Sequence, residues 1–159
     1  MSALTAGEQA LVMLFRQRLE GEGALPQVRT LLYLACGVSG VEVALASFEA
    51  MFGLLARRAR RVLGFHRATC EAVSADERVL LGLIAAHQAG WAAQAAGLAR
   101  WLVPGAAADE LGAHAQALAR ALAQRSRHVP VRDRFGRRGA IGSGPPSGAV
   151  AVELYHASH

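Results

Sequence analysis

The segment FHRATCE, residues 65–71, holds the side chains of this chain whose chemistry and spacing could form a metal site. His66 and Cys70 are four residues apart, Glu71 is beside them, and His87 follows in the next expected helix. Imidazole and thiolate are ligands that zinc prefers, and a four-residue spacing places two side chains on one side of a helical turn. The candidate metal ligands are therefore His66 and Cys70, with His87 as a further partner.

A structural interpretation of the same residues is simpler. No second cysteine or histidine at a two-residue spacing accompanies them, and the segment falls between two expected helices, where helical geometry is not assured. Cysteine usually packs as a small hydrophobic residue, and a lone histidine on an apolar helix face, such as His87, usually bonds to neighbouring polar groups. We therefore expect Cys70 to be packed, with no metal and no other cofactor bound.

The sequence motifs of common enzyme classes are missing from the chain. The glycine-rich stretch GRRGAIGSGPPSG, residues 136–148, lacks the GK[ST] ending of a phosphate-binding loop, and its prolines remove N–H groups that a phosphate needs. No GxSxG, HExxH or paired-carboxylate arrangement occurs. The sequence therefore predicts a protein that is not an enzyme and has no catalytic residues.

Arginine accounts for all 17 basic residues, and most of the arginines fall in two short stretches. Residues 57–61 read RRARR, while residues 125–138 carry six arginines against one aspartate, a net charge of +5 that equals the net charge of the whole chain. Such stretches suit a phosphate backbone or an acidic protein face, and a stretch that is only solvated by water is an equal alternative. The candidate binding residues are Arg57, Arg58, Arg60, Arg61, Arg125, Arg127, Arg132, Arg134, Arg137 and Arg138.

Three Ser or Thr residues, each followed three residues later by Glu, predict helix starts. The pairs are Thr5 with Glu8, Ser39 with Glu42, and Ser74 with Glu77. In such a capping box the hydroxyl accepts from a backbone N–H of the first turn, and the carboxylate accepts from the backbone N–H of the capping residue. The third pair explains SADE, residues 74–77, as the beginning of a helix and not as part of a chemical site.

Apolar periodicity predicts six helices. Their expected ranges are residues 6–19, 26–36, 41–62, 75–88, 91–102 and 109–124. The third is the most apolar, with a seam at Val41, Leu45, Phe48, Phe52, Leu55, Ala59 and Val62 that Met51 and Leu54 widen. We expect this helix at the centre of a bundle, with Phe48, Phe52 and Leu55 nearly fully buried.

Six helices joined by short connections predict an all-α fold, a compact bundle over residues 1–125. Residues 126–159 form a basic tail, rich in Gly and Pro, without helical periodicity. Within the tail, VPVRDRF and AVAVELY have the composition of short strands that could pair as a β-hairpin, and a tail without fixed structure is the other interpretation. If the tail is ordered, we expect its apolar residues to be buried.

The composition excludes several classes of protein. Hydrophobic residues make up 53% of the 159 residues and charged residues 18%, which excludes an intrinsically disordered chain. No uninterrupted apolar run reaches the roughly 18 to 20 residues of a membrane span. The N-terminus lacks the basic and apolar regions of a secretory signal, and nothing indicates a disulfide between Cys36 and Cys70. We therefore expect a cytoplasmic protein with free thiols.

Two functions of different classes remain open. The first is a non-enzymatic interaction or adaptor protein that docks on a larger partner or self-associates through its C-terminal tail. The alternative is a nucleic-acid-binding regulator that places the arginines of residues 57–61 and 125–138 on phosphates. Asparagine is absent, so such a regulator would contact the backbone more than the bases. The two alternatives differ in whether both arginine stretches lie on one continuous face.

Overall fold

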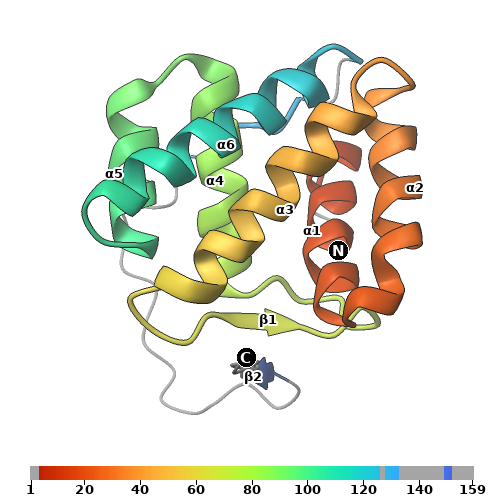
Figure 1. The fold of residues 1–159 in the computed structure, drawn as a ribbon, viewed down its shortest axis with the longest axis horizontal. Coiled ribbons are helices and arrows are strands. Elements are labelled where there is room, and N and C mark those ends of the chain that lie inside the picture. Colours follow the sequence, from red (N-terminus) through yellow and green to blue (C-terminus); the bar gives the residue numbers. More distant parts are fainter. Residues whose placement is uncertain (1–3, 126–127, 133–148, 152–159) are drawn as a thin grey trace, which may run out of the picture.

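A computed structural model of the chain describes residues 4–125, 128–132 and 149–151 (Figure 1). Its six helices confirm the all-α fold that the sequence predicts. They are α1 (Ala6–Leu19), α2 (Leu25–Cys36), α3 (Val41–Arg58), α4 (Ala75–Ala89), α5 (Ala92–Leu102) and α6 (Ala106–Ala123). A 3-10 turn, η1 (Glu22–Ala24), joins the first two helices, and a short strand, β1 (Gly64–His66), precedes α4.

The helices pack as a bundle in which α4 is the most completely buried. Figure 1 shows α1 and α2 side by side on one flank, α5 on the opposite flank and α3 crossing between them. Helix α4 packs against α1, α5 and α6, and each residue from 79 to 86 is buried. The sequence predicted α3 as the central helix, but the run VLLGLIAA makes α4 apolar on all sides, so this helix occupies the centre.

Two of the three predicted capping boxes are present. Thr5 with Glu8 begins α1, and Ser74 with Glu77 begins α4, with both reciprocal hydrogen bonds formed in each pair. The prediction for Ser39 with Glu42 is wrong, because α3 begins after Gly40 and the Ser39 side chain does not cap it.

The failed cap has a cause outside its own segment. The Glu42 carboxylate, which would complete the box, instead accepts hydrogen bonds from the Arg29 guanidinium of α2. Meanwhile the carbonyl of Gly37 accepts from the backbone N–H groups of Gly40 and Val41, so a tight turn leads into the helix. A tertiary ion pair and a turn therefore replace the local motif.

Helix α3 is shorter than its apolar seam predicted, and it is rotated relative to that seam. It ends at Arg58, and the chain then leaves helical geometry because the backbone N–H of Arg60 donates to the Leu102 carbonyl of α5, at 2.9 Å. Val62, the last residue of the expected seam, is consequently 64% exposed. Helix α3 instead buries Ala44, Ser47 and Met51, which are not among the seven residues of the seam.

Aromatic side chains form the part of the core where α1, α3 and β1 meet. Phe15 and Phe48 are fully buried and stack with their ring centroids 6.1 Å apart, and Phe65 of β1 contacts Phe15 edge to face. Phe52 packs against all three rings but is only partly buried, which corrects the expectation of nearly full burial. The expectation is confirmed for Phe48 and for Leu55.

The described part of the tail lies against the bundle. Val129 is buried, its backbone N–H donates to the Gln88 side-chain oxygen at 2.7 Å, and Val131 packs against the core. Farther along, β2 (Ala149–Ala151) pairs antiparallel with β1, with Val150 opposite Phe65. The expected burial of apolar tail residues is confirmed for Val129, while Val131 is only partly buried. A hairpin between residues 129–135 and 149–155 falls mostly outside the described residues and stays a prediction.

Candidate functional site

A buried ion pair organises the segment that raised the question of a metal site. Arg16 of α1 and Glu77 of α4 have side chains without any exposed surface, and the guanidinium donates to both carboxylate oxygens, at 2.7 and 3.0 Å. The same guanidinium donates to the carbonyls of Cys70 and Ala72, at 2.6 and 2.5 Å. The loop between β1 and α4 is therefore wrapped around one arginine side chain.

The Glu77 carboxylate joins the loop and the helix into the same network. It accepts from the backbone N–H of Ser74 at 2.7 Å and from that of His66 at 3.4 Å, in addition to its two bonds from Arg16. Because a buried charge needs both a partner and hydrogen bonds, this full set of contacts accounts for its burial. The sequence interpretation missed Arg16, although a charged residue inside the apolar stripe of its helix was a signal for it.

The candidate metal ligands do not come together. His66 lies in β1 with its Nδ1 buried and without a hydrogen-bond partner, and Cys70 is partly exposed in the loop that Arg16 holds. His87 lies near the end of α4, on the side of Gly112 in α6. Within the described ranges, no three His, Cys, Asp or Glu side chains are grouped so as to hold a metal ion.

The pKa values of the candidate His87 and of Cys36, which was not a candidate, are both shifted toward the uncharged form. Burial, and then the nearby positive charge of Arg120, lowers the pKa of His87, so this imidazole is neutral at physiological pH. Burial likewise raises the pKa of the other cysteine, Cys36, to about 11, which leaves its thiol protonated and unreactive. Both side chains are therefore uncharged at physiological pH.

Two of the four arginines of residues 57–61 bond to neighbouring helices. Arg60 donates from Nε to the Arg100 carbonyl at 2.8 Å, so it caps the C-terminus of α5. Arg61 bonds the Asp76 carboxylate of α4, and its guanidinium lies 4.5 Å from the ring centroid of Trp101. Hydrogen bonds to Asp76 raise the pKa of Arg61, which keeps it charged. Arg57 and Arg58 are exposed in the last turn of α3.

The arginines of the second stretch that the structure describes also contact their own bundle. Arg125 lies against Gly37, so it sits beside the connection between α2 and α3. Arg132 donates two hydrogen bonds to the buried Glu8 carboxylate, at 2.6 and 2.7 Å. The other four members, Arg127, Arg134, Arg137 and Arg138, lie outside the described residues.

The two arginine stretches do not form one continuous face in the described part of the chain. Arg57 and Arg58 are at the C-terminal end of α3, whereas Arg125 contacts Gly37 just before its N-terminal end. An 18-residue helix is about 27 Å long. Arg57 and Arg58 therefore lie at the opposite end of α3 from Arg125, which does not favour a single phosphate-binding surface.

The Glu8–Arg132 pair makes the docking of the tail depend on pH. Burial alone would raise the pKa of the Glu8 carboxyl, but hydrogen bonds from Arg132 and Thr5 outweigh it, so the pKa is below its ordinary value of 4.5. A lowered carboxyl pKa stabilises the fold above the ordinary pKa, and this contribution is lost as the pH falls through the lowered value.

We expect Arg132→Ala to lower the free energy of unfolding by about 1 to 3 kcal/mol at neutral pH, since it leaves a buried carboxylate without its cationic partner. The loss should shrink in acid, below the lowered pKa, where Glu8 is protonated in both proteins. Urea unfolding at several pH values measures it. The control is Glu8→Gln, which should remove this pH dependence; an equal loss at all pH values would contradict the assignment.

Exposed apolar side chains gather at one end of the α2–α3 hairpin. Tyr33 and Leu34 are 50% and 59% exposed in the last turns of α2, Val38 is 78% exposed in the connection, and Val43 is 56% exposed at the start of α3. These four residues, here called the hairpin patch, are the majority of the seven exposed large hydrophobic residues in the described part of the chain. The remaining three, Val62, Trp91 and Trp101, belong to other segments.

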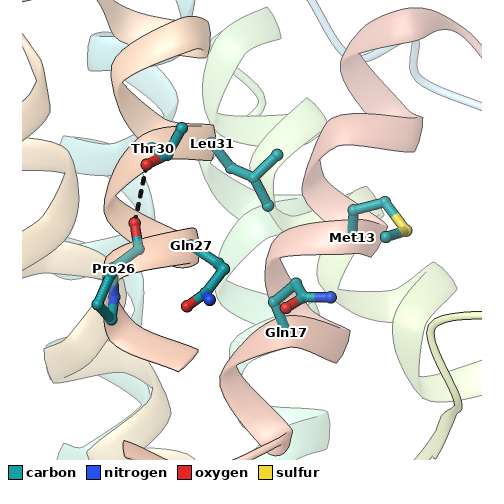
Figure 2. Close-up of a pocket in the computed structure, with 6 residues that line it drawn as sticks. All are labelled: Met13, Gln17, Pro26, Gln27, Thr30 and Leu31. Carbon is teal, nitrogen blue, oxygen red and sulfur yellow. Dashed lines mark hydrogen bonds between the residues drawn. The ribbon is translucent and has the colours of Figure 1, made fainter. Parts of the chain in front are cut away.

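An open groove of about 420 Å³ runs between α1 and α2, on the flank next to the hairpin patch. Figure 2 shows Leu31 pointing from α2 toward Met13 and Gln17 of α1, with Gln27 below it. Pro26 and Thr30 complete the wall, and the Thr30 hydroxyl donates to the Pro26 carbonyl at 2.9 Å. The groove is mostly apolar and has no charged residue in its lining.

Comparison of the chain with models of protein families, with curated proteins and with solved structures finds no match. Among the described residues, no helix combines the length and the hydropathy that a membrane span requires.

Proposed function

We propose that this protein is a non-enzymatic interaction protein that works by docking on another protein chain. The observation that carries the proposal is the hairpin patch, where Tyr33, Leu34, Val38 and Val43 expose large apolar side chains within eleven residues. A concentration of exposed apolar side chains, with an aromatic residue among them, is typical of protein-binding sites.

The contacts of the arginines support a protein partner over a phosphate backbone. Arg60 bonds α5, Arg61 bonds Asp76, and Arg132 bonds Glu8, so these guanidinium groups fix segments of the same molecule. The described tail residues 128–132 also bond to the bundle. The surface that we propose for docking therefore lies on the helices, although the sequence pointed to the tail.

A double substitution in the hairpin patch tests the proposal. We expect Val38→Ser with Val43→Ser to keep the fold, because both side chains are more than half exposed, and to remove the protein that co-purifies with the tagged wild-type chain from the cells that produce it. Quantitative mass spectrometry of the two purifications measures the difference, with a loss of more than about tenfold for substitutions in the centre of an interface.

The matched control is Val62→Ser, which changes an equally exposed valine at the other end of the molecule and should leave the co-purified protein unchanged. Retention of the same protein by the double variant would contradict the proposal, as would a wild-type chain that brings down nucleic acid and no protein.

Nucleic-acid binding is a second candidate because of one specific contact. The Arg61 guanidinium lies over the exposed Trp101 ring. Two further exposed arginines, Arg58 and Arg100, lie in the two segments that the hydrogen bond of Arg60 connects, the end of α3 and the end of α5. Bases stack on exposed aromatic rings and arginines neutralise phosphates, so this surface suits single-stranded nucleic acid. In the same purification, an associated oligonucleotide that is released by salt and by Trp101→Ala would favour this candidate.

A further inference from the structure

We propose that the outer face of α1 and α2 binds the same face of a second copy of this chain, and this inference rests on the proposed function because it names the protein partner. The face consists of the groove between the two helices, lined by Met13, Gln17, Gln27 and Leu31, together with the exposed Leu34 one turn farther along α2. Leu31 and Leu34 are three residues apart, so they continue one stripe of the helix surface.

Four of the six charged residues of this part of the chain lie away from the face, and the other two lie at its end. Six occur between residues 4 and 36. Glu8 and Arg16 are buried, Arg18 donates to Glu49 of α3, and Arg29 bonds Glu42 of α3. The other two, Glu20 and Glu22, are in the connection at one end of the groove.

Between its ends, this two-helix face carries no charge, in contrast to other surfaces of the molecule. The chain carries a net charge of +5, and arginines are exposed at the ends of α3, α5 and α6. Two copies that approach through those surfaces bring like charges together, which is unfavourable. The centre of the α1–α2 face allows two copies to meet without this repulsion, and the depletion of charge together with the presence of Met is typical of the centre of an interface.

The polar residues of the face also suit self-association. A two-fold axis places each residue opposite its counterpart or a close neighbour, so the surface must complement itself. The Gln17 and Gln27 amides each have both a donor and an acceptor, and they can therefore pair with the same amides of the other copy. Two α1–α2 pairs packed in this way form a four-helix arrangement with an apolar seam at Met13, Leu31 and Leu34.

The size of the face sets the strength of the dimer. A helix of 14 residues is about 21 Å long and two adjacent helices are together about 20 Å wide, so the dimer buries about 800 Å² in total, which is below the roughly 1,200 Å² of stable protein interfaces. We therefore expect a reversible dimer that dissociates on dilution. Because the centre of the interface is uncharged and Glu20 and Glu22 lie only at its end, raising the salt concentration should strengthen the dimer or leave it unchanged.

Sedimentation equilibrium of the purified full chain tests the inference. The expected result is a monomer–dimer equilibrium for the wild type and a weakening of at least about a hundredfold for Leu34→Arg, which places a charge in the apolar seam of the interface. The control is Val62→Arg, at an exposed valine outside the face, which should dimerise as the wild type does. Oxidation of the Met13 thioether by peroxide should slow as the wild-type chain is concentrated, while circular dichroism confirms that the variants are folded.

A wild-type chain that stays monomeric overturns the inference, and so does a dimer that Leu34→Arg leaves unchanged. A monomer in which Met13 is protected at all concentrations also overturns it, by showing that the chain covers its own face. In each case the proposed function still stands if another protein co-purifies with the wild type and is lost with Val38→Ser and Val43→Ser. The two proposals therefore fail on different measurements.

Discussion

Arg16→Ala is expected to lower the free energy of unfolding by about 3 to 5 kcal/mol, a large part of the stability of a domain of this size. The substitution removes a guanidinium that has no exposed surface and leaves the Glu77 carboxylate buried beside two backbone donors. It also removes the donors to the carbonyls of Cys70 and Ala72, so the loop between β1 and α4 loses its central contact. Chemical denaturation followed by circular dichroism measures the effect.

Arg18→Ala is the matched control, because this arginine is two residues away on the same helix and pairs with Glu49 at 2.9 Å while keeping a quarter of its side chain exposed. An ion pair in that setting contributes about 0 to 1 kcal/mol. A double-mutant cycle with Glu77→Gln isolates the coupling, and the double variant should lose much less than the sum of the single losses. Equal losses for Arg16→Ala and Arg18→Ala would show that burial of the pair has no energetic consequence.

The features that the sequence predicted are those with local causes. Thr5 and Ser74 cap their helices because each finds its glutamate three residues away, within one turn. Pro26 lies in the first turn of α2 and Gly37 ends it with a φ of 77°, which glycine adopts without strain. Such signals are complete within a few residues, and together with the apolar periodicity of each helix they led to the helix count and the all-α class.

The features that the sequence did not predict depend on contacts between distant residues. Arg16 and Glu77 are 61 positions apart, and Glu8 and Arg132 are 124 apart. The sequence gives the positions of both arginines, but only the fold shows that Arg16 is buried and that Arg132 connects the tail to α1. The hairpin patch could not be predicted either, because Tyr33, Leu34 and Val38 are exposed only if no other segment covers that end of α2.

Phe48→Ala is expected to cost about 3 to 5 kcal/mol of unfolding free energy, whereas Phe52→Ala should cost clearly less. Phe48 is fully buried against Phe15, and its removal leaves a cavity that the surrounding α1 and α6 side chains cannot fill without moving. Phe52 contacts the same aromatic cluster but keeps part of its ring at the surface, so truncation there creates less enclosed empty volume.

The comparison of the two phenylalanines tests how α3 is rotated in the bundle. The apolar seam of the sequence predicts equal burial of Phe48 and Phe52. Equal losses of unfolding free energy in the two variants would mean that this seam, and not the stripe of Ala44, Phe48, Met51 and Leu55, faces the core. Thermal and urea unfolding of both variants measure the order. A larger loss for Phe48→Ala follows only if α3 turns this stripe inward, because the hydrophobic and cavity contributions both increase with the burial of the truncated ring.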